Sequence, residues 1–555
     1  MKSNFKIVAL GGLDENGKNA YVIETEKDMI LIEAGCANFT NKSLGIDIIV
    51  PDFSYVLKHK NKLRGVLISH GHFDQMGGLR YLLDEVKVEV YGSSFTTEFL
   101  KNFVNKNDEH LLKEIKYNTP IKLGELEINV FTLSHAIFGN FGFTIANGQE
   151  AIIYATDYNF DQTTVKFART DIKKIVDLAD RYKVRALLTE SIGVEHTGMA
   201  AAKQGFHSLL ERYIEESNGR MIVSLYSSNL AGMTNIIRLA ERYDRKIVIV
   251  GRDLLTYLNI AKGAKHIKHQ RDLFIRIANL SDYQDDEIII VVAGLYSEPY
   301  IELEKMALGK HNIVKIKQTD SVLIASKAYD EIESMAQATL DVVARTHCKI
   351  KTFNINVSSH AYQEDIKMLI NLIEPEMIIP IKGEYRRQKA VQELATNIGF
   401  EMSDVHLLEN GEILEVFADY AAKTTSFTPN NTLMSSKDVA KVNQIILKDR
   451  EVLSDNGYVM IILSFVKNTN KIIQEPELIT GGLNSFEQDL DVIEGCRKII
   501  LSEVQKDYSN RELVNKLKTK LSRYLQGAIG KTPMILPVRM EVEPKRIKET
   551  KNEDA

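Results

Sequence analysis

Short apolar runs that end on histidine, aspartate or glutamate constrain the fold of this chain more than any other feature. The run RGVLIS (64–69) leads directly into His70-Gly71-His72-Phe73-Asp74, VFTLSH ends at His135, and IIYATD ends at Asp157. Polar groups at strand ends lie on loops that a rigid sheet holds in place, the usual position of a site in an α/β protein. We therefore expect an α/β fold with its functional groups at the ends of strands.

The same residues have the chemistry of a metal site. Two imidazoles and a carboxylate at alternate positions can converge on one cation or on two neighbouring ones. Imidazole and carboxylate ligands suit Zn²⁺ or Mn²⁺. An isolated His-x-His pair is weak evidence, because two histidines on a loop are more often structural or exposed. The further strand-end donors His135 and Asp157 make a metal site the better interpretation.

The chain has 555 residues, which is too long for a single hydrophobic core. The sequence pattern also changes along it. From about residue 206, buried-type strands such as KIVIVGR and EIIIVVAG alternate with helical segments, which predicts a parallel α/β sheet. Polar strand-end motifs return near 351, and the last hundred residues combine strands with amphipathic helices. We expect a first domain in two parts, 1–205 and 351–422, an inserted domain over 206–350, a linker over 423–450, a C-terminal domain over 451–545 and a disordered tail over 546–555.

Charge and cysteine content limit the partners and the compartment. With a formal net charge of −5, a nucleic acid would have to be held by a local basic lining. The three cysteines form no CxxC pair, which fits a reducing cytosol better than a disulfide framework. No segment approaches the roughly 18 apolar residues of a membrane span, and the N-terminus lacks the features of a signal peptide. We expect a cytoplasmic protein without membrane contact.

The motifs resemble, in their order, the metallo-β-lactamase nuclease superfamily, and within it the ribonuclease J family. The stretch from about 206 to 350 resembles the β-CASP domain of the branch that processes nucleic acids. Segments similar to ribonuclease J follow one another over nearly the whole chain: LGIDIIVPDFSYV, TDYNFDQTTV, NVSSHAYQED, PIKGEYRR and TPMILPVRMEV. The resemblance implies a metallo-β-lactamase αββα sandwich, an inserted β-CASP domain and a small C-terminal α/β domain. That last domain is either an oligomerisation element or a self-contained unit.

The chain departs from the family pattern at the second metal, as a divergent paralogue would. The family motif H-x-H-x-D-H ends here in Gln75, and the histidine of P-x-H-G-E-Y-R is replaced by Lys382. The resemblance gives one ion an intact set of ligands: His70, His72, His135 and Asp157. The other ion would use Asp74, Asp157 and the two changed positions. A protonated lysine has no acceptor and repels a divalent ion, so we expect one ion or none, with the Lys382 ammonium in place of the second.

The phosphate-binding and acid groups of the family are kept only in part. Its H-x-S-G-H-A motif appears as Asn356-Val357-Ser358-Ser359-His360-Ala361, so the candidate proton donor is kept as His360. Residues 356–359 either contact phosphate or form a polar loop that closes a strand, and His360 is either an acid or a loop histidine without function. Ser228, Asn229 and Lys382 complete the candidate substrate contacts. Glu190 keeps an acidic motif, and Glu33 stands where aspartate is usual.

The resemblance implies hydrolysis of RNA from the 5′ end, and also internally, in RNA maturation and decay. Asp74, Asp157 and His360 would be the catalytic groups. Loss of one metal removes several kcal/mol of transition-state stabilisation, and each 1.36 kcal/mol is about tenfold in rate, so a ribonuclease of low activity is the first hypothesis. The alternative is an inactive RNA-binding subunit that partners an active ribonuclease J paralogue. A homodimer and membership of an RNA degradosome remain open, and a small-molecule hydrolase is disfavoured.

Overall fold

The computed structural model describes residues 4–38, 46–162, 168–200, 204–263, 266–326, 328, 332–353, 359–435, 440–442, 444–467, 469, 471–483, 489–506 and 508–542. The chain divides into two compact units, residues 1–38 with 48–432 and residues 39–47 with 433–555. No helix among the described residues is long and apolar enough to cross a membrane. The expected tail, 546–555, lies outside these residues.

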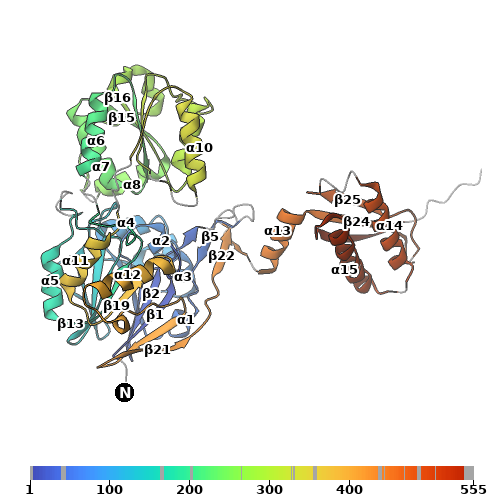
Figure 1. Ribbon diagram of the computed structural model, residues 1–555, viewed down its shortest axis with the longest axis horizontal. Helices are drawn as coiled ribbons and strands as arrows, with labels where there is room; N and C mark the ends of the chain where they lie inside the picture. Colours follow the sequence, from blue (N-terminus) through green and yellow to red (C-terminus); the bar gives the residue numbers. More distant parts are fainter. Residues whose placement is uncertain are drawn as a thin grey trace, which may run out of the picture. The chain divides into compact units, whose positions relative to one another are not determined.

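Two sheets packed face to face form the base of the first unit (Figure 1). One has the order β21 (Ala421–Ser426), β20 (Glu412–Val416), β1 (Phe5–Gly11), β2 (Ala20–Glu24), β3 (Met29–Ile32), β6 (Leu63–Leu67), β7 (Val90–Gly92) and β8 (Leu112–Glu114). The other has the order β19 (Ile378–Ile381), β13 (Lys183–Glu190), β12 (Glu150–Ala155), β11 (Phe141–Asn147), β10 (Leu126–Thr132) and β9 (Ile121–Leu123). Buried side chains of both sheets, among them Phe5, Ile30, Phe143 and Ile152, share one core.

Helices cover the outer faces of this sandwich. On the second sheet, α5 (Ile172–Arg181), α11 (Gln363–Ile373) and α12 (Tyr385–Asn397) bury apolar side chains in a separate core. On the side of the first sheet lie α1 (Ser54–Lys58), α3 (Leu79–Glu85) and α4 (Ser94–Leu100). The expected αββα sandwich is therefore confirmed. Two distant parts of the chain build it, because β20 pairs with β1 in one sheet and β19 pairs with β13 in the other.

An inserted domain connects these two parts. Its five strands are all parallel, in the order β15 (Lys246–Val250), β16 (Ile288–Gly294), β14 (Met221–Tyr226), β17 (Ser321–Ile324) and β18 (Lys349–Thr352). The helix α6 (Gln204–Glu215) precedes these strands, and the helices between them are α7 (Leu230–Arg242), α8 (Arg252–Gly263), α9 (Glu298–Ala307) and α10 (Glu333–Ala344). The strands β14 and β16 are buried almost throughout, as parallel strands under two helical layers must be, whereas the edge strand β18 is partly exposed. The predicted parallel α/β insertion is confirmed.

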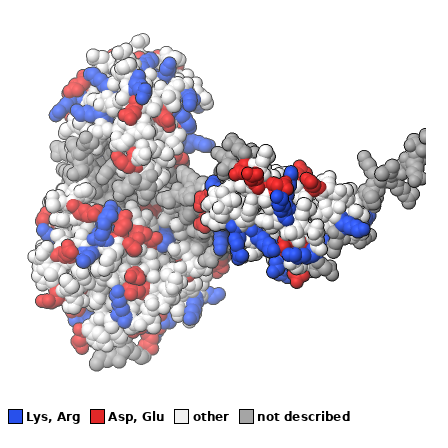
Figure 2. Space-filling view, turned by 45° about the vertical axis from the view of Figure 1, so that its right-hand side comes forward, with Lys and Arg blue, Asp and Glu red and all other residues white. Residues whose placement is uncertain are grey.

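The second unit contains a small α/β domain. Strand β24 (Tyr458–Val466) pairs in parallel with β26 (Met534–Val542) and antiparallel with β25 (Glu477–Gly481). The helices α14 (Leu490–Val504) and α15 (Asn510–Ile529) pack on one face of this sheet. The helix α13 (Gln444–Asn456) precedes this domain. Two further strand pairs are short and antiparallel. The strand β4 (Ala37–Asn38) pairs with β5 (Ile48–Val50), and β22 (Thr432–Ser435) pairs with β23 (Ala440–Val442). Acidic and basic side chains are interspersed over the face of the first unit that Figure 2 shows.

Candidate metal centre

One edge of the sandwich collects the ionisable side chains. His135, Asp157, Glu190 and Lys382 lie at or just after the carboxyl ends of β10, β12, β13 and β19, which belong to one sheet. The strands β12, β13 and β19 are parallel, so their carboxyl ends meet at the same edge. Two antiparallel steps, from β12 to β11 and from β11 to β10, bring the end of β10 to that edge as well.

The other sheet supplies His70 and His72 from the loop that follows β6, and the short helix α2 (Phe73–Met76) carries Asp74 and Gln75. The Glu33 carboxyl group fixes the start of this loop, since the backbone N–H of Ser69 lies 3.2 Å from both of its oxygens and donates to them. Burial raises the pKa of Glu33 to about 8. Glycine suits position 71, because a Cβ there would lie 2.8 Å from the Phe99 ring and the ring would have to move.

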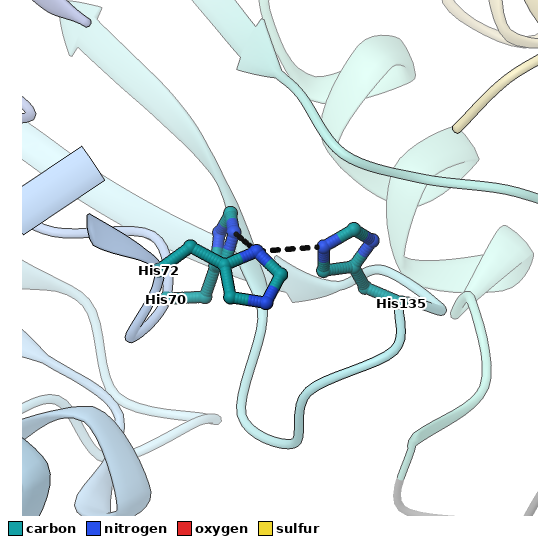
Figure 3. A group of neighbouring side chains, drawn as sticks. All are labelled: His70, His72 and His135. Atoms are coloured by element: carbon teal, nitrogen blue, oxygen red, sulfur yellow. Dashed lines mark hydrogen bonds between the residues drawn. The ribbon is translucent and has the colours of Figure 1, made fainter. Parts of the chain in front are cut away.

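Three imidazoles from these loops converge on one point (Figure 3). His72 Nδ1 lies 3.0 Å from His70 Nε2 and 3.1 Å from His135 Nε2. The outer nitrogens of two of the rings have partners: His70 Nδ1 meets Ser69 Oγ at 2.9 Å, and His135 Nδ1 meets the backbone carbonyl of Ser359 at 2.8 Å. A carbonyl only accepts, so His135 carries its proton on Nδ1 and turns the lone pair of Nε2 inward.

The charge state of these histidines suits a cation. Burial lowers the pKa of His70 to about 3 and that of His72 to about 4, and it lowers the pKa of His135 well below its usual value. All three rings are therefore neutral near pH 7, the form in which imidazole binds metal. Asp157 Oδ2 lies 3.7 Å from His70 Nε2 and adds a carboxylate beside them. Three neutral imidazoles and a carboxylate are the donor set of a Zn²⁺ site, so the residues fit one ion.

The space between Asp74 and Asp157 contains a side-chain cation. Lys382 Nζ lies 2.8 Å from Asp74 Oδ2 and contacts both carboxylate oxygens of Asp157. Gln75 Nε2 donates to Asp157 Oδ2 at 2.6 Å and to Asp74 Oδ2 at 3.3 Å. Lys382 is only 2% exposed. Burial lowers its pKa, but the charges of Asp157 and Asp74 outweigh this effect and raise the pKa above its usual value.

A second charged pair lies next to Asp157. His360 Nδ1 is 2.7 Å from Glu190 Oε2 and 3.1 Å from Asp157 Oδ1. Backbone N–H groups of Tyr158 and Ala361 donate to the other oxygen of Glu190. Burial lowers the pKa of His360, but the charge of Glu190, helped by Asp157, outweighs it and raises the pKa to about 9. His360 is therefore an imidazolium at neutral pH.

Three residues of the centre have strained backbones. Glu33, Asp157 and Lys382 have φ angles of 62°, 55° and 50°, in the left-handed region that side chains other than glycine rarely adopt. Such residues persist where their surroundings fix them, and they cluster at functional sites. Two of these residues, Asp157 and Lys382, contact each other in the cluster.

The predicted site residues fall into three groups. The first group comes together at the centre, and the backbone carbonyl of Ser359 accepts from His135 there. This group consists of His70, His72, Asp74, His135, Asp157, His360 and Lys382. Ser228 and Asn229 lie at the start of α7, where the Asn229 side chain accepts from the Gly232 N–H as a helix cap. Their loop adjoins the centre, since the Ala231 N–H donates to the carbonyl of Ala136. Asn356, Val357 and Ser358 lie outside the described residues.

Sequence reasoning missed one residue of the centre. Asn19 Nδ2 donates to the backbone carbonyl of Asp74 at 3.0 Å and to its Oδ2 at 3.2 Å. Asn19 belongs to the turn LDENGKN between β1 and β2, and no local pattern distinguishes it from an ordinary turn asparagine.

Four family models match the chain in the order of its domains. They are the metallo-beta-lactamase superfamily over 13–148, the ribonuclease J beta-CASP domain over 218–341, the Zn-dependent metallo-hydrolase RNA specificity domain over 345–406 and the ribonuclease J C-terminal domain over 445–542. Ribonuclease J2 of Bacillus subtilis is 30% identical over 550 residues, 97% of this chain and 99% of that protein. The chain belongs to the ribonuclease J family.

Other relatives agree with this assignment. Ribonuclease J 2 of Streptococcus pyogenes is 29% identical and covers 97% of this chain and 100% of its own. Ribonuclease J 2 of Staphylococcus aureus is 29% identical, over 97% and 98%. A crystal structure of a protein of unknown function from Enterococcus faecalis V583 shares the fold, with a TM-score of 0.54 and 14% identity over 74% of this chain and all of its own. Membership confirms the resemblance to ribonuclease J and places the chain among metal-dependent hydrolases of RNA.

Proposed function

We propose that this member of the ribonuclease J family is a ribonuclease of low intrinsic activity, acting 5′ to 3′ and also internally in cytoplasmic RNA maturation and decay, with one metal ion or none rather than two. The observation that carries the proposal is the place of Lys382 Nζ between Asp74 and Asp157. In the family those two carboxylates serve the second ion. An ammonium at contact distance repels a divalent cation by several kcal/mol even at a moderate dielectric constant.

The histidine half of the centre keeps its donors. His70, His72, His135 and Asp157 would hold one Zn²⁺ or Mn²⁺, which when bound supplies a Lewis acid and an activated water. His360 holds a proton at neutral pH and can donate it to the leaving oxygen of a phosphodiester. The Lys382 ammonium places a positive charge beside Asp157. The carboxylates of Asp74 and Asp157 both contact this ammonium and so balance its charge. We also propose Ser228, Asn229 and residues 356–359 as substrate contacts.

The metal count and the rate test this proposal together. Purified protein is assayed for bound metal and for turnover of a 5′-monophosphorylated RNA, with His72→Ala and the double variant Gln75→His/Lys382→His as comparisons. We expect one ion and slow turnover that His72→Ala abolishes, and a second ion and faster turnover in the double variant. Two ions in the wild-type protein would refute the proposal.

A second candidate function is an inactive RNA-binding subunit that partners an active ribonuclease J paralogue. The carboxylates of Asp74 and Asp157 already have several side-chain donors, which leaves them little need of a metal ion, and this favours the second candidate. The donors are Lys382, Gln75, Asn19 and His360. Absence of metal, together with RNA cleavage that is indifferent to His72→Ala, would select it.

Assembly with a copy of the chain or with a paralogue is proposed to use the C-terminal unit. Alternate residues of its strands face away from α14 and α15, and the exposed ones include Ile479 (40%), Val538 (38%) and Met540 (48%). Apolar side chains gathered on one open sheet face mark a protein contact. Sedimentation of the chain alone, and of the chain mixed with the paralogue, distinguishes a homodimer from a hetero-oligomer.

A further inference from the structure

The helix α15 has two faces of different chemistry. Its buried face consists of leucines at every fourth position: Leu513, Leu517, Leu521 and Leu525. Lys516, Lys520 and Arg523 are exposed on another side of the helix. Residues three and four apart are neighbours on a helix surface, so these three cations form one row along the helix.

Lys506, just beyond the end of α14, extends the row. Lys506 and Lys520 both contact Oε1 of Glu503, the latter at 2.7 Å, so their ammonium groups are neighbours. The Glu503 side chain is 0% exposed, whereas the two lysine side chains are 47% and 48% exposed. One buried carboxylate therefore lies beneath two cations that face solvent. We call Lys506, Lys516, Lys520 and Arg523 the basic patch.

The charge of this helix is local. Its sequence holds five Lys and Arg residues and one acid, Glu512, whose carboxylate is bound to Ser509 at the helix start. The whole chain has a net charge of −5. In Figure 2 the C-terminal unit shows its basic and acidic side chains mostly on different sides. A ligand attracted here is therefore selected by a local field that the rest of the protein opposes.

We propose that the basic patch binds the phosphate backbone of RNA, as a contact separate from the metal centre. Exposed, flexible Lys and Arg side chains suit phosphate oxygens and carry no base specificity. A row of cations on a helix complements a polyanion, whereas an acidic protein partner would need its own folded counter-surface. The proposal goes beyond the proposed function and takes from it only that RNA is the ligand.

Salt-dependent binding tests the patch. The probe is a 5′-monophosphorylated single-stranded RNA with phosphorothioate linkages that resist hydrolysis, and the full chain is titrated against it from 50 to 300 mM salt. The test variant is Lys516→Gln/Lys520→Gln/Arg523→Gln, which leaves Lys506 to compensate Glu503. Glutamine has a helix propensity close to that of lysine and arginine. Lys516→Gln/Arg523→Gln, which keeps the Lys520–Glu503 pair, guards against a folding defect.

A matched control removes the same charge from the same unit. Lys448, Lys467 and Lys471 are exposed and lie outside the patch, and Lys448→Gln/Lys467→Gln/Lys471→Gln changes the net charge equally. Each phosphate contact with single strands contributes about −0.7 to the slope of log K against log salt. We expect the patch variant to bind about tenfold more weakly at low salt, with a slope shallower by about 2, and the control to bind like the wild type.

The possible results separate the two proposals. The patch proposal is overturned if the patch variant and the control lose RNA affinity equally. It is also overturned if neither loses affinity while the wild type binds RNA. Both results leave the proposed function standing. Failure of the wild-type chain to bind RNA overturns both. A smaller but measurable loss in the double variant, with an unchanged melting temperature, supports the patch.

Discussion

Lys382 Nζ lies 2.8 Å from Asp74 Oδ2 and contacts Asp157, although 225 residues separate Lys382 from Asp157 in the chain. A fixed cation thus balances carboxylates that would otherwise repel one another inside the protein. Removing one partner of a buried ion pair is more costly than never having had the pair, because the remaining charge stays buried without compensation.

Lys382→Met is therefore expected to destabilise the first unit by about 3–5 kcal/mol. The measurement is thermal unfolding followed by calorimetry, with the C-terminal transition as internal reference. Added Mn²⁺ should stabilise Lys382→Met more than it stabilises the wild type, because only the variant leaves the place of the Lys382 ammonium open to a second ion. Stability that is equal in the two proteins without metal would show that the ion pair does not hold the site together.

Chelation is expected to leave the wild-type fold intact. The three histidines are neutral when buried, and Lys382 satisfies the carboxylates without an ion, so removal of metal uncovers no buried charge. The melting temperature in excess chelator should fall by no more than a few degrees. His72→Ala should weaken metal binding by about 100-fold or more in a chelator competition. His110→Ala, which changes an exposed histidine outside the centre, should leave metal binding unchanged.

The proton of His360 predicts a pH dependence. Its pKa rises from 6.5 to about 9 in the folded protein, so the stabilisation it provides is full below about pH 6.5 and is lost as the pH rises through about 9. Any cleavage that uses His360 as an acid should decline over the same upper range. His360→Gln should flatten the stability profile between pH 6.5 and 9. A profile of the same shape in this variant would assign the titration to another group.

The architecture and half of the metal centre could be predicted from the sequence. Apolar runs that end on His70, His135 and Asp157 carry their own local signal, since a strand places its last residue at the edge of the sheet. The role of Lys382 required the family resemblance, because the sequence alone shows an ordinary lysine after a buried strand. The contacts of Asn19 with Asp74, and of Glu190 with His360, are long-range and leave no pattern in the neighbouring residues.

The most direct test of this account is a crystal structure of the wild-type protein soaked in Mn²⁺, with anomalous scattering recorded to locate the ions. We predict one anomalous peak, among His70, His72 and His135, and the Lys382 ammonium in contact with Asp74 and Asp157. Two peaks, with Lys382 displaced from between these carboxylates, would contradict the central claim that a lysine has taken the place of the second ion.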